Sequence, residues 1–175
     1  CGFDATVFPI EQHLQNGGAW VTVVDGKAGV MQASGFVSLV DLNSVQWTFN
    51  GNFKPSVYNL LFILGALWGY FDGEIPTPTL KSLETSKLSD DGGRLTLYEN
   101  TQGVKILADY AHEKFSLVEV AKLARSLASP AGKVIGVLRL AYDRTEELIE
   151  DTAKHIAPYY DNFVIYDKID GRLRR

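Results

Sequence analysis

The pattern of apolar and polar positions changes character about halfway along the chain. In the first half, short apolar runs of strand-like composition are separated by turn dipeptides such as Asp25-Gly26. They predict a small antiparallel meander with strands at 20–24, 29–32, 36–42 and 45–49. A longer apolar run follows, and Pro55 is suited to a first helical turn. This run predicts a helix over 55–71, with an apolar face wide enough to be covered on several sides.

Strands and helices alternate in the second half. Strands are predicted at 94–98, 104–108, 134–138 and 163–166, and helices at 117–128 and 145–156, after a short helix at 80–84. This alternation predicts a parallel sheet with right-handed crossovers, and hence an α/β fold class. The proline-rich segment 74–79 and the polar stretch 86–93 predict a boundary between two domains, residues 1–92 and 93–175.

The segment from Ile106 to Leu117 combines the end of a strand, a polar turn and the start of a helix. Ser116 and Glu119 have the spacing of a capping box, which predicts that the helix starts just after Ser116. Asp109 then lies at the carboxyl end of a strand. In open α/β sheets this edge is where ligands bind.

Three parallel strands ending near Asp109, Leu140 and Asp167 would carry several polar side chains to one rim of the sheet. The predicted rim residues are Asp109, His112, Asp143, Arg144 and Asp167, with Arg94 as a second cation entering from the linker. A carboxylate there accepts hydrogen bonds from ribose hydroxyls, an imidazole stacks on a base, and an arginine binds phosphate oxygens.

Two structural alternatives stay open for these residues. Aspartate and histidine are common turn residues after a strand. Asp143-Arg144, followed by Thr145 and two glutamates, also fits an ordinary helix start with acids in its first turn.

Composition excludes some classes of protein. The chain has 175 residues, 46% of them hydrophobic, and a net charge of −4, which disfavours nucleic-acid binding. The chain has a single cysteine, Cys1, which excludes an internal disulfide and fits a reducing compartment. No signal-peptide pattern opens the chain, so a cytoplasmic location is expected. The apolar run 57–71 is shorter than the roughly 20 residues that a membrane span needs. His13 and His155 each have a single acid nearby, so no metal site is predicted.

The first methionine is Met31, and the sequence opens on Cys1. We therefore expect the chain to be a piece of a longer protein, with an incomplete catalytic apparatus.

Four motifs occur in an order that resembles the Mur ligase superfamily. They are Val57-Tyr58-Asn59-Leu60-Leu61, Gly93-Arg94, Asp109-Tyr110-Ala111-His112 and Asp143-Arg144. His13-Leu14-Gln15-Asn16-Gly17-Gly18 and the acids after Asp143-Arg144 are similar to the Mur-like half of cyanophycin synthetases. The resemblance covers nearly the whole chain. It implies that residues 1–92 are the later part of a central ATPase domain, β-rich and helical, and that 93–175 form a Rossmann-like, parallel-sheet carboxyl-terminal domain.

The resemblance implies an ATP-dependent ligase that forms an amide through an acyl phosphate, using an amino acid such as arginine. Asn59 and His112 would lie by the adenine, Arg94 and Asp109 would contact the phosphate and the ribose, and Asp143 and Arg144 would bind substrate. Catalytic residues are unknown. The partners implied are ATP with Mg²⁺, whose ligands are expected outside this chain, and an amino acid. A homo-oligomer formed through other domains stays open.

The sequence departs from the family pattern at three places. The phosphate loop ending in Gly-Lys-Ser/Thr is absent, Glu113-Lys114 stands where the family has Asn-Pro, and Arg139-Leu140-Ala141-Tyr142 replaces a small, glycine-rich run. Two alternatives therefore remain: a degenerate Mur-ligase-like module without catalysis, and a Mur ligase of peptidoglycan synthesis. The acids after Asp143-Arg144 weigh mildly against the second.

Overall fold

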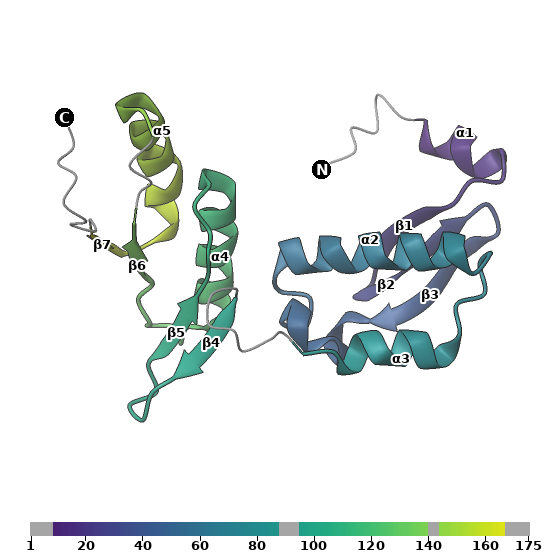
Figure 1. Ribbon diagram of the computed structural model, residues 1–175, viewed down its shortest axis with the longest axis horizontal. Coiled ribbons are helices and arrows are strands. Elements are labelled where there is room, and N and C mark those ends of the chain that lie inside the picture. The colour runs from purple at the N-terminus through teal and green to yellow at the C-terminus, as the bar shows by residue number, and fades with distance from the viewer. Residues whose placement is uncertain (1–8, 88–94, 140–143, 167–175) are drawn as a thin grey trace. The chain divides into compact units, whose positions relative to one another are not determined.

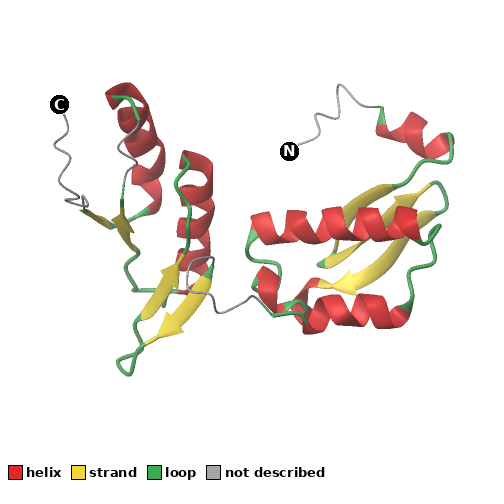
Figure 2. Cartoon of the chain, in the orientation of Figure 1, coloured by secondary structure: helices red, strands yellow, loops and turns green. Residues whose placement is uncertain are grey.

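The chain is a mixed α/β protein with small sheets (Figures 1 and 2). The structure is a computed structural model that describes residues 9–87, 95–139 and 144–166. The chain divides into two compact units, Cys1–Lys87 and Leu88–Arg175. Arg94, Asp143 and Asp167 of the predicted rim lie outside the described residues. Among the residues that are described, no helix has both the length and the apolar character to cross a membrane.

The first unit contains a three-stranded antiparallel sheet in the order β1-β2-β3. Its strands are β1 Trp20–Val24, β2 Lys27–Gln32 and β3 Gly35–Asp41. Asp25 and Gly26 join the first two strands, and both have positive φ (47° and 74°). A two-residue loop of this kind matches the twist of the strands that it connects. The predicted meander is confirmed for these three strands.

The predicted fourth strand at 45–49 is wrong. This segment forms two short 3₁₀ turns, η1 Leu42–Ser44 and η2 Gln46–Thr48. Asp41 Oδ1 accepts a hydrogen bond from the Asn43 amide (2.9 Å), and Thr48 Oγ1 donates to the Val45 carbonyl (2.8 Å). Short polar side chains thus satisfy nearby backbone groups that a strand would pair with a neighbour, and this favours the turns.

Helices α2 Lys54–Tyr70 and α3 Thr77–Thr85 pack on the sheet, and the short helix α1 Ile10–Gln15 precedes it (Figure 1). The core is formed by one face of α2 and by residues of β2, β3 and the 3₁₀ segment: Ala28, Val40, Leu42, Val45, Val57, Leu60 and Leu64. The Trp47 indole donates to the Leu83 carbonyl (2.9 Å), which ties α3 to the 3₁₀ segment. The predicted helix at 55–71 is confirmed.

Within the described part of the first unit, α2 is not covered on several sides as the pattern predicts. Tyr58, Phe62 and Tyr70 are 49%, 69% and 79% exposed. Only part of the wide apolar face of α2 is therefore buried in the core of this unit.

The second unit contains two separate strand pairs and two longer helices. In chain order its elements are β4 Thr96–Glu99, β5 Lys105–Ala108, α4 Lys114–Leu127, β6 Ile135–Leu138, α5 Glu146–Ile156, η3 Ala157–Tyr159 and β7 Asn162–Ile165. Strands β6 and β7 are parallel, as expected for a β-α-β unit. Strands β4 and β5 form an antiparallel hairpin instead.

The single parallel sheet predicted for this unit is therefore wrong among the described residues, where β5 pairs with β4 alone and β6 with β7. The tight connection explains the hairpin. Asn100 Oδ1 accepts from the amides of Gln102 and Val104 (2.9 Å each), and Gly103 has a φ of 76°. A parallel pairing needs a long crossover, which this turn does not provide.

Helices α4 and α5 meet in a second small core of Leu117, Val118 and Ile156. The Tyr160 hydroxyl donates to the Leu117 carbonyl (2.8 Å), and burial raises the pKa of Tyr160 to about 12. At the other end of α4, Asp161 Oδ2 accepts from Arg125 Nη2 and from the Val134 amide (2.6 Å each). These bonds connect α4, β6 and the start of β7.

Candidate functional site at the start of helix α4

Asp109 organises the loop between β5 and α4. Its Oδ2 accepts a hydrogen bond from the Leu95 amide (2.9 Å), and its Oδ1 accepts one from the Ala111 amide (2.7 Å). Leu95 is buried and has a left-handed φ of 48°. The carboxylate therefore holds the strained entry to β4 against the exit of β5, and this is a structural role. Each oxygen retains a further acceptor position.

Helix α4 begins three residues earlier than the pattern predicts. The capping box is formed by Glu113 as the N-cap and Ser116 as the third helical residue, with the Glu113 amide donating to Ser116 Oγ (3.2 Å). The predicted box of Ser116 with Glu119 is wrong, because Ser116 lies inside the helix and is not its N-cap. Glu119 forms an ion pair with Lys122 instead (2.7 Å). Glu113 thus caps the helix amides that follow the Asp109 loop.

Glu113 also forms an ion pair with Arg144, which precedes α5. The Nη2 to Oε1 distance is 2.5 Å, and the Arg144 side chain is only 13% exposed. The hydrogen bond from Arg144 lowers the pKa of Glu113, with smaller contributions from the charges of Arg144 and His112. The pair joins the N-cap of α4 to the residue just before the N-cap of α5.

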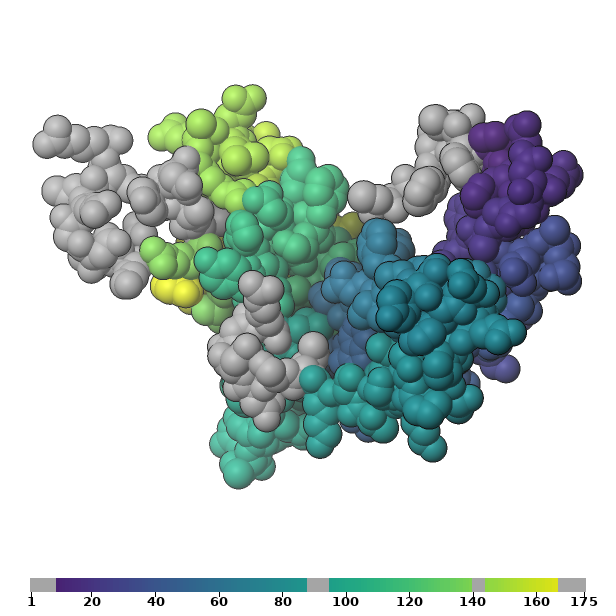
Figure 3. Space-filling view, turned by 45° about the vertical axis from the view of Figure 1, so that its right-hand side comes forward, coloured from purple at the N-terminus to yellow at the C-terminus, as the bar shows by residue number. Residues whose placement is uncertain are grey.

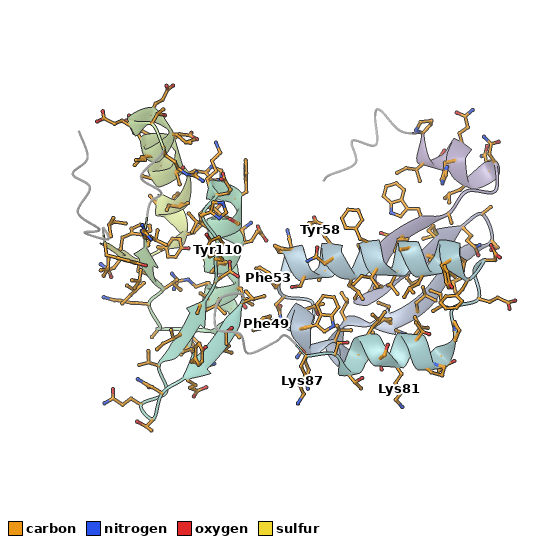
Figure 4. All side chains as sticks on the ribbon, viewed as in Figure 1. Phe49, Phe53, Tyr58, Lys81, Lys87 and Tyr110 are labelled. Carbon is orange, nitrogen blue, oxygen red and sulfur yellow. The ribbon has the colours of Figure 1, made fainter. Side chains whose placement is uncertain are left out.

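His112 lies beside this pair. Its Nε2 is 3.8 Å from Glu113 Oε1, and its Nδ1 is 3.1 Å from the Tyr110 carbonyl. A carbonyl only accepts, so Nδ1 carries the hydrogen in that contact. The ring also makes an edge contact with Tyr110 at 5.6 Å between centroids, and Tyr110 is 74% exposed. Figure 4 labels Tyr110 on this loop. Two exposed rings therefore lie in the loop that Asp109 organises.

The structure brings together three of the six predicted site residues: Asp109, His112 and Arg144. Asn59 belongs to the first unit, where it is exposed on the second turn of α2, directly after Tyr58 in the sequence. Arg94 and Asp143 lie outside the described residues. The predicted start of the helix at Thr145 is confirmed, because Thr145 Oγ1 accepts from the Leu148 amide (3.3 Å) and Glu146 and Glu147 occupy the first turn.

Sequence reasoning missed the pairing role of Glu113 and a second cross-helix ion pair. Lys114 Nζ lies 2.6 Å from Asp151 Oδ2 on α5, and this contact lowers the pKa of Asp151. The sequence does contain a signal for both ion pairs. An acid and a base are adjacent at Glu113-Lys114, and residues of opposite charge, Arg144 and Asp151, follow near the next helix. Opposite charges on two helices pair only if the helices are neighbours, which the pattern alone does not establish.

The other candidate ligands form no cluster. His13 Nε2 contacts the Ala19 carbonyl (3.2 Å), and His155 packs edge-on against Phe115 (5.2 Å). Within the ranges that the structure describes, no group of three or more His, Cys, Asp or Glu residues is placed to hold a metal ion.

Comparison with known proteins gives no family assignment. No protein-family model matches the chain, and no curated protein matches it significantly.

Proposed function

We propose that the chain is part of an ATP-dependent amide ligase of the Mur ligase superfamily, similar to the Mur-like half of cyanophycin synthetases. The enzyme would act in the cytoplasm and join a carboxylate, activated as an acyl phosphate, to an amino acid such as arginine. The observation that carries the proposal is the Asp109-Tyr110-Ala111-His112 loop between a strand and a helix, with Arg144 beside it.

The loop has the chemistry that a nucleoside requires. Asp109 is held by two backbone amides and keeps acceptor capacity for ribose hydroxyls. Tyr110 and His112 are exposed and offer ring faces for a base. Asn59, exposed on α2, and Arg94 and Asp143, outside the described residues, enter the proposal through the order of the motifs alone.

The same proposal assigns the first unit to the later part of a central ATPase domain and the second to the carboxyl-terminal ligase domain. The phosphate loop and the Mg²⁺ ligands would then be supplied by other parts of the protein. This chain would bind nucleotide weakly and would not turn over by itself.

A second candidate is a degenerate ligase module that binds a partner without catalysis. The ion pair between Glu113 and Arg144 favours it, because that arginine is neutralised and largely buried. A nucleotide phosphate would have to displace Glu113 before it could bind the guanidinium.

Calorimetric titration of the chain with ATP, ADP and adenosine distinguishes the two candidates. The ligase proposal predicts weak binding that requires the adenosine group and is lost in His112→Ala and Tyr110→Ala. Gln46→Ala, at an exposed polar position of the first unit, is the control and should bind as the wild type does. No heat at millimolar ATP from folded protein would contradict the ligase proposal and leave the degenerate module.

A further inference from the structure

The outward face of α2 carries a continuous apolar stripe that no other described element of the first unit covers. Its members recur every fourth residue: Tyr58, Phe62, Ala66 and Tyr70. Three are aromatic and 49–79% exposed, while Val57, Leu60 and Leu64 on the opposite face are buried. In the space-filling view, α2 (blue) reaches the surface of the first unit (Figure 3). We call these four residues the α2 stripe.

We propose that the α2 stripe is the contact of a homodimer, in which α2 of one copy packs antiparallel against α2 of a second copy. A row of residues four apart is the ridge that interlocks with the same ridge of another helix in the commonest mode of helix packing. The first argument for a second copy is therefore that the stripe presents the geometry that a self-complementary, two-fold interface needs.

The second argument is the order of large and small side chains. Tyr58 and Tyr70 lie equally far from the middle of the stripe, as do Phe62 and Ala66. An antiparallel two-fold pairing places Phe62 of each copy over Ala66 of the other, so that a large side chain faces a small one. The two tyrosines then meet at the ends, where their hydroxyls stay in water.

The third argument is charge. No charged residue occurs between Pro55 and Tyr70, so two copies can approach without repulsion. The helix begins with the exposed Lys54 and is followed by the exposed acids Asp72 and Glu74. Antiparallel pairing brings the lysine of each copy toward the acids of the other, and it also opposes the two helix dipoles.

The area is sufficient for a weak dimer. With Ile63, which is 39% exposed beside the stripe, the exposed apolar side chains offer roughly 500 Å² per copy, because a fully buried aromatic side chain contributes about 150–250 Å². Two copies would bury about 1,000 Å², the lower limit for a specific interface. We therefore expect a dissociation constant in the micromolar range.

Sedimentation velocity of the 175-residue chain across the micromolar range tests the dimer. The wild type should shift from monomer to dimer, and Phe62→Arg should raise the dissociation constant at least about tenfold, because Phe62 lies near the centre of the contact. Val137→Arg is the matched control, since Val137 is similarly exposed (64%) on β6 of the second unit. It should dimerise normally. Ala66→Arg provides a second disruptive variant if Phe62→Arg does not fold.

Charge reversal tests the antiparallel orientation. Lys54→Glu should weaken the dimer, and Lys54→Glu combined with Asp72→Lys and Glu74→Lys should restore it. A chain that stays monomeric at all concentrations, a dimer that survives both arginine variants, or a triple variant no better than Lys54→Glu would each overturn the proposal. The dimer does not depend on the ligase proposal, because its readout is association in the absence of nucleotide.

Discussion

Glu113 and Arg144 are joined by a 2.5 Å ion pair across 31 positions of the sequence. The pair links the N-cap of α4 to the residue just before the N-cap of α5. It also neutralises the one described arginine that the sequence assigned to ligand binding. Any anion that uses Arg144 must therefore compete with Glu113.

Glu113→Gln should strengthen the binding of pyrophosphate to the second unit. The glutamine keeps an acceptor for the helix amides but removes the charge that occupies Arg144. The expected gain in affinity is about fivefold, because the carboxylate of the pair is exposed and such ion pairs contribute at most about 1 kcal/mol. Calorimetric titration with pyrophosphate measures it, and Glu119→Gln, which breaks the ion pair to Lys122 on the same helix, is the control. Equal affinities of wild type and Glu113→Gln would show that Arg144 is not an anion site.

Acid should destabilise the second unit through Asp161. Hydrogen bonds from the Val134 amide and from Arg125 lower the pKa of this carboxyl in the folded state. The unfolded chain then binds its proton first as the pH falls, so the contribution of Asp161 is complete above the unfolded pKa, near 3.8, and is lost as the pH drops through the folded value.

Asp161→Asn should therefore lower stability at neutral pH and lose less stability than the wild type on acidification. Urea unfolding at pH 7 and at acid pH, followed by far-ultraviolet circular dichroism, measures both effects. Glu150→Gln, which removes an exposed ion pair to Lys154, is the control. Parallel pH profiles for wild type and Asp161→Asn would contradict the prediction.

Hydrophobic periodicity predicted most elements, but it predicted the pairing of the strands only in the first unit. The α2 helix and the strands of the first meander follow directly from their apolar spacing. The error at 45–49 arose because local hydrogen bonds of Asp41 and Thr48 outweigh strand propensity. In the second unit, the alternation of strands and helices led to the prediction of a parallel sheet. The tight turn between β4 and β5, which favours a hairpin, was not taken into account.

The sequence predicted which described residues lie at the candidate site, but not which groups they contact. Asp109 and His112 were found because a polar turn after an apolar strand is visible in sequence. The partners of Asp109 are backbone amides, which carry no side-chain signal. The pairing of Glu113 with Arg144 depends on how α4 and α5 lie together, and tertiary packing decides that.

Tyr160 should make the second unit sensitive to alkali. Burial raises the pKa of Tyr160 to about 12, so the unfolded chain loses this proton first, near pH 10. Its contribution is complete below pH 10 and is lost as the pH rises toward 12. Ultraviolet absorbance of tyrosinate should show one late-titrating group in the wild type that is missing in Tyr160→Phe.

Tyr160→Phe should also be less stable at neutral pH by about 1 kcal/mol, because the Leu117 carbonyl loses its donor. Tyr98→Phe is the control, since Tyr98 is 48% exposed on β4. A Tyr160→Phe variant that titrates like the wild type would exclude Tyr160 as the late group.

Two glycines of the first unit should respond to alanine in opposite directions. At Gly29 a Cβ would lie 2.2 Å from the Val37 carbonyl oxygen, a backbone atom of the neighbouring strand. The register of β2 against β3 shifts between Ala28 and Gly29, so this close approach belongs to the sheet itself. Gly69 lies within α2, and a Cβ there meets nothing within 4 Å.

Gly29→Ala should lower the free energy of unfolding by about 3 kcal/mol or more, because the strands must separate to accept the methyl group. Gly69→Ala should raise it by about 1 kcal/mol, the difference in helix propensity between the two residues. Tryptophan fluorescence reports on this unit alone, because Trp20, Trp47 and Trp68 all lie within it. Urea titrations at a concentration where the chain is monomeric separate the two effects from association. A stable Gly29→Ala would mean that β2 and β3 tolerate a different register, and the sheet of the first unit would have to be reconsidered.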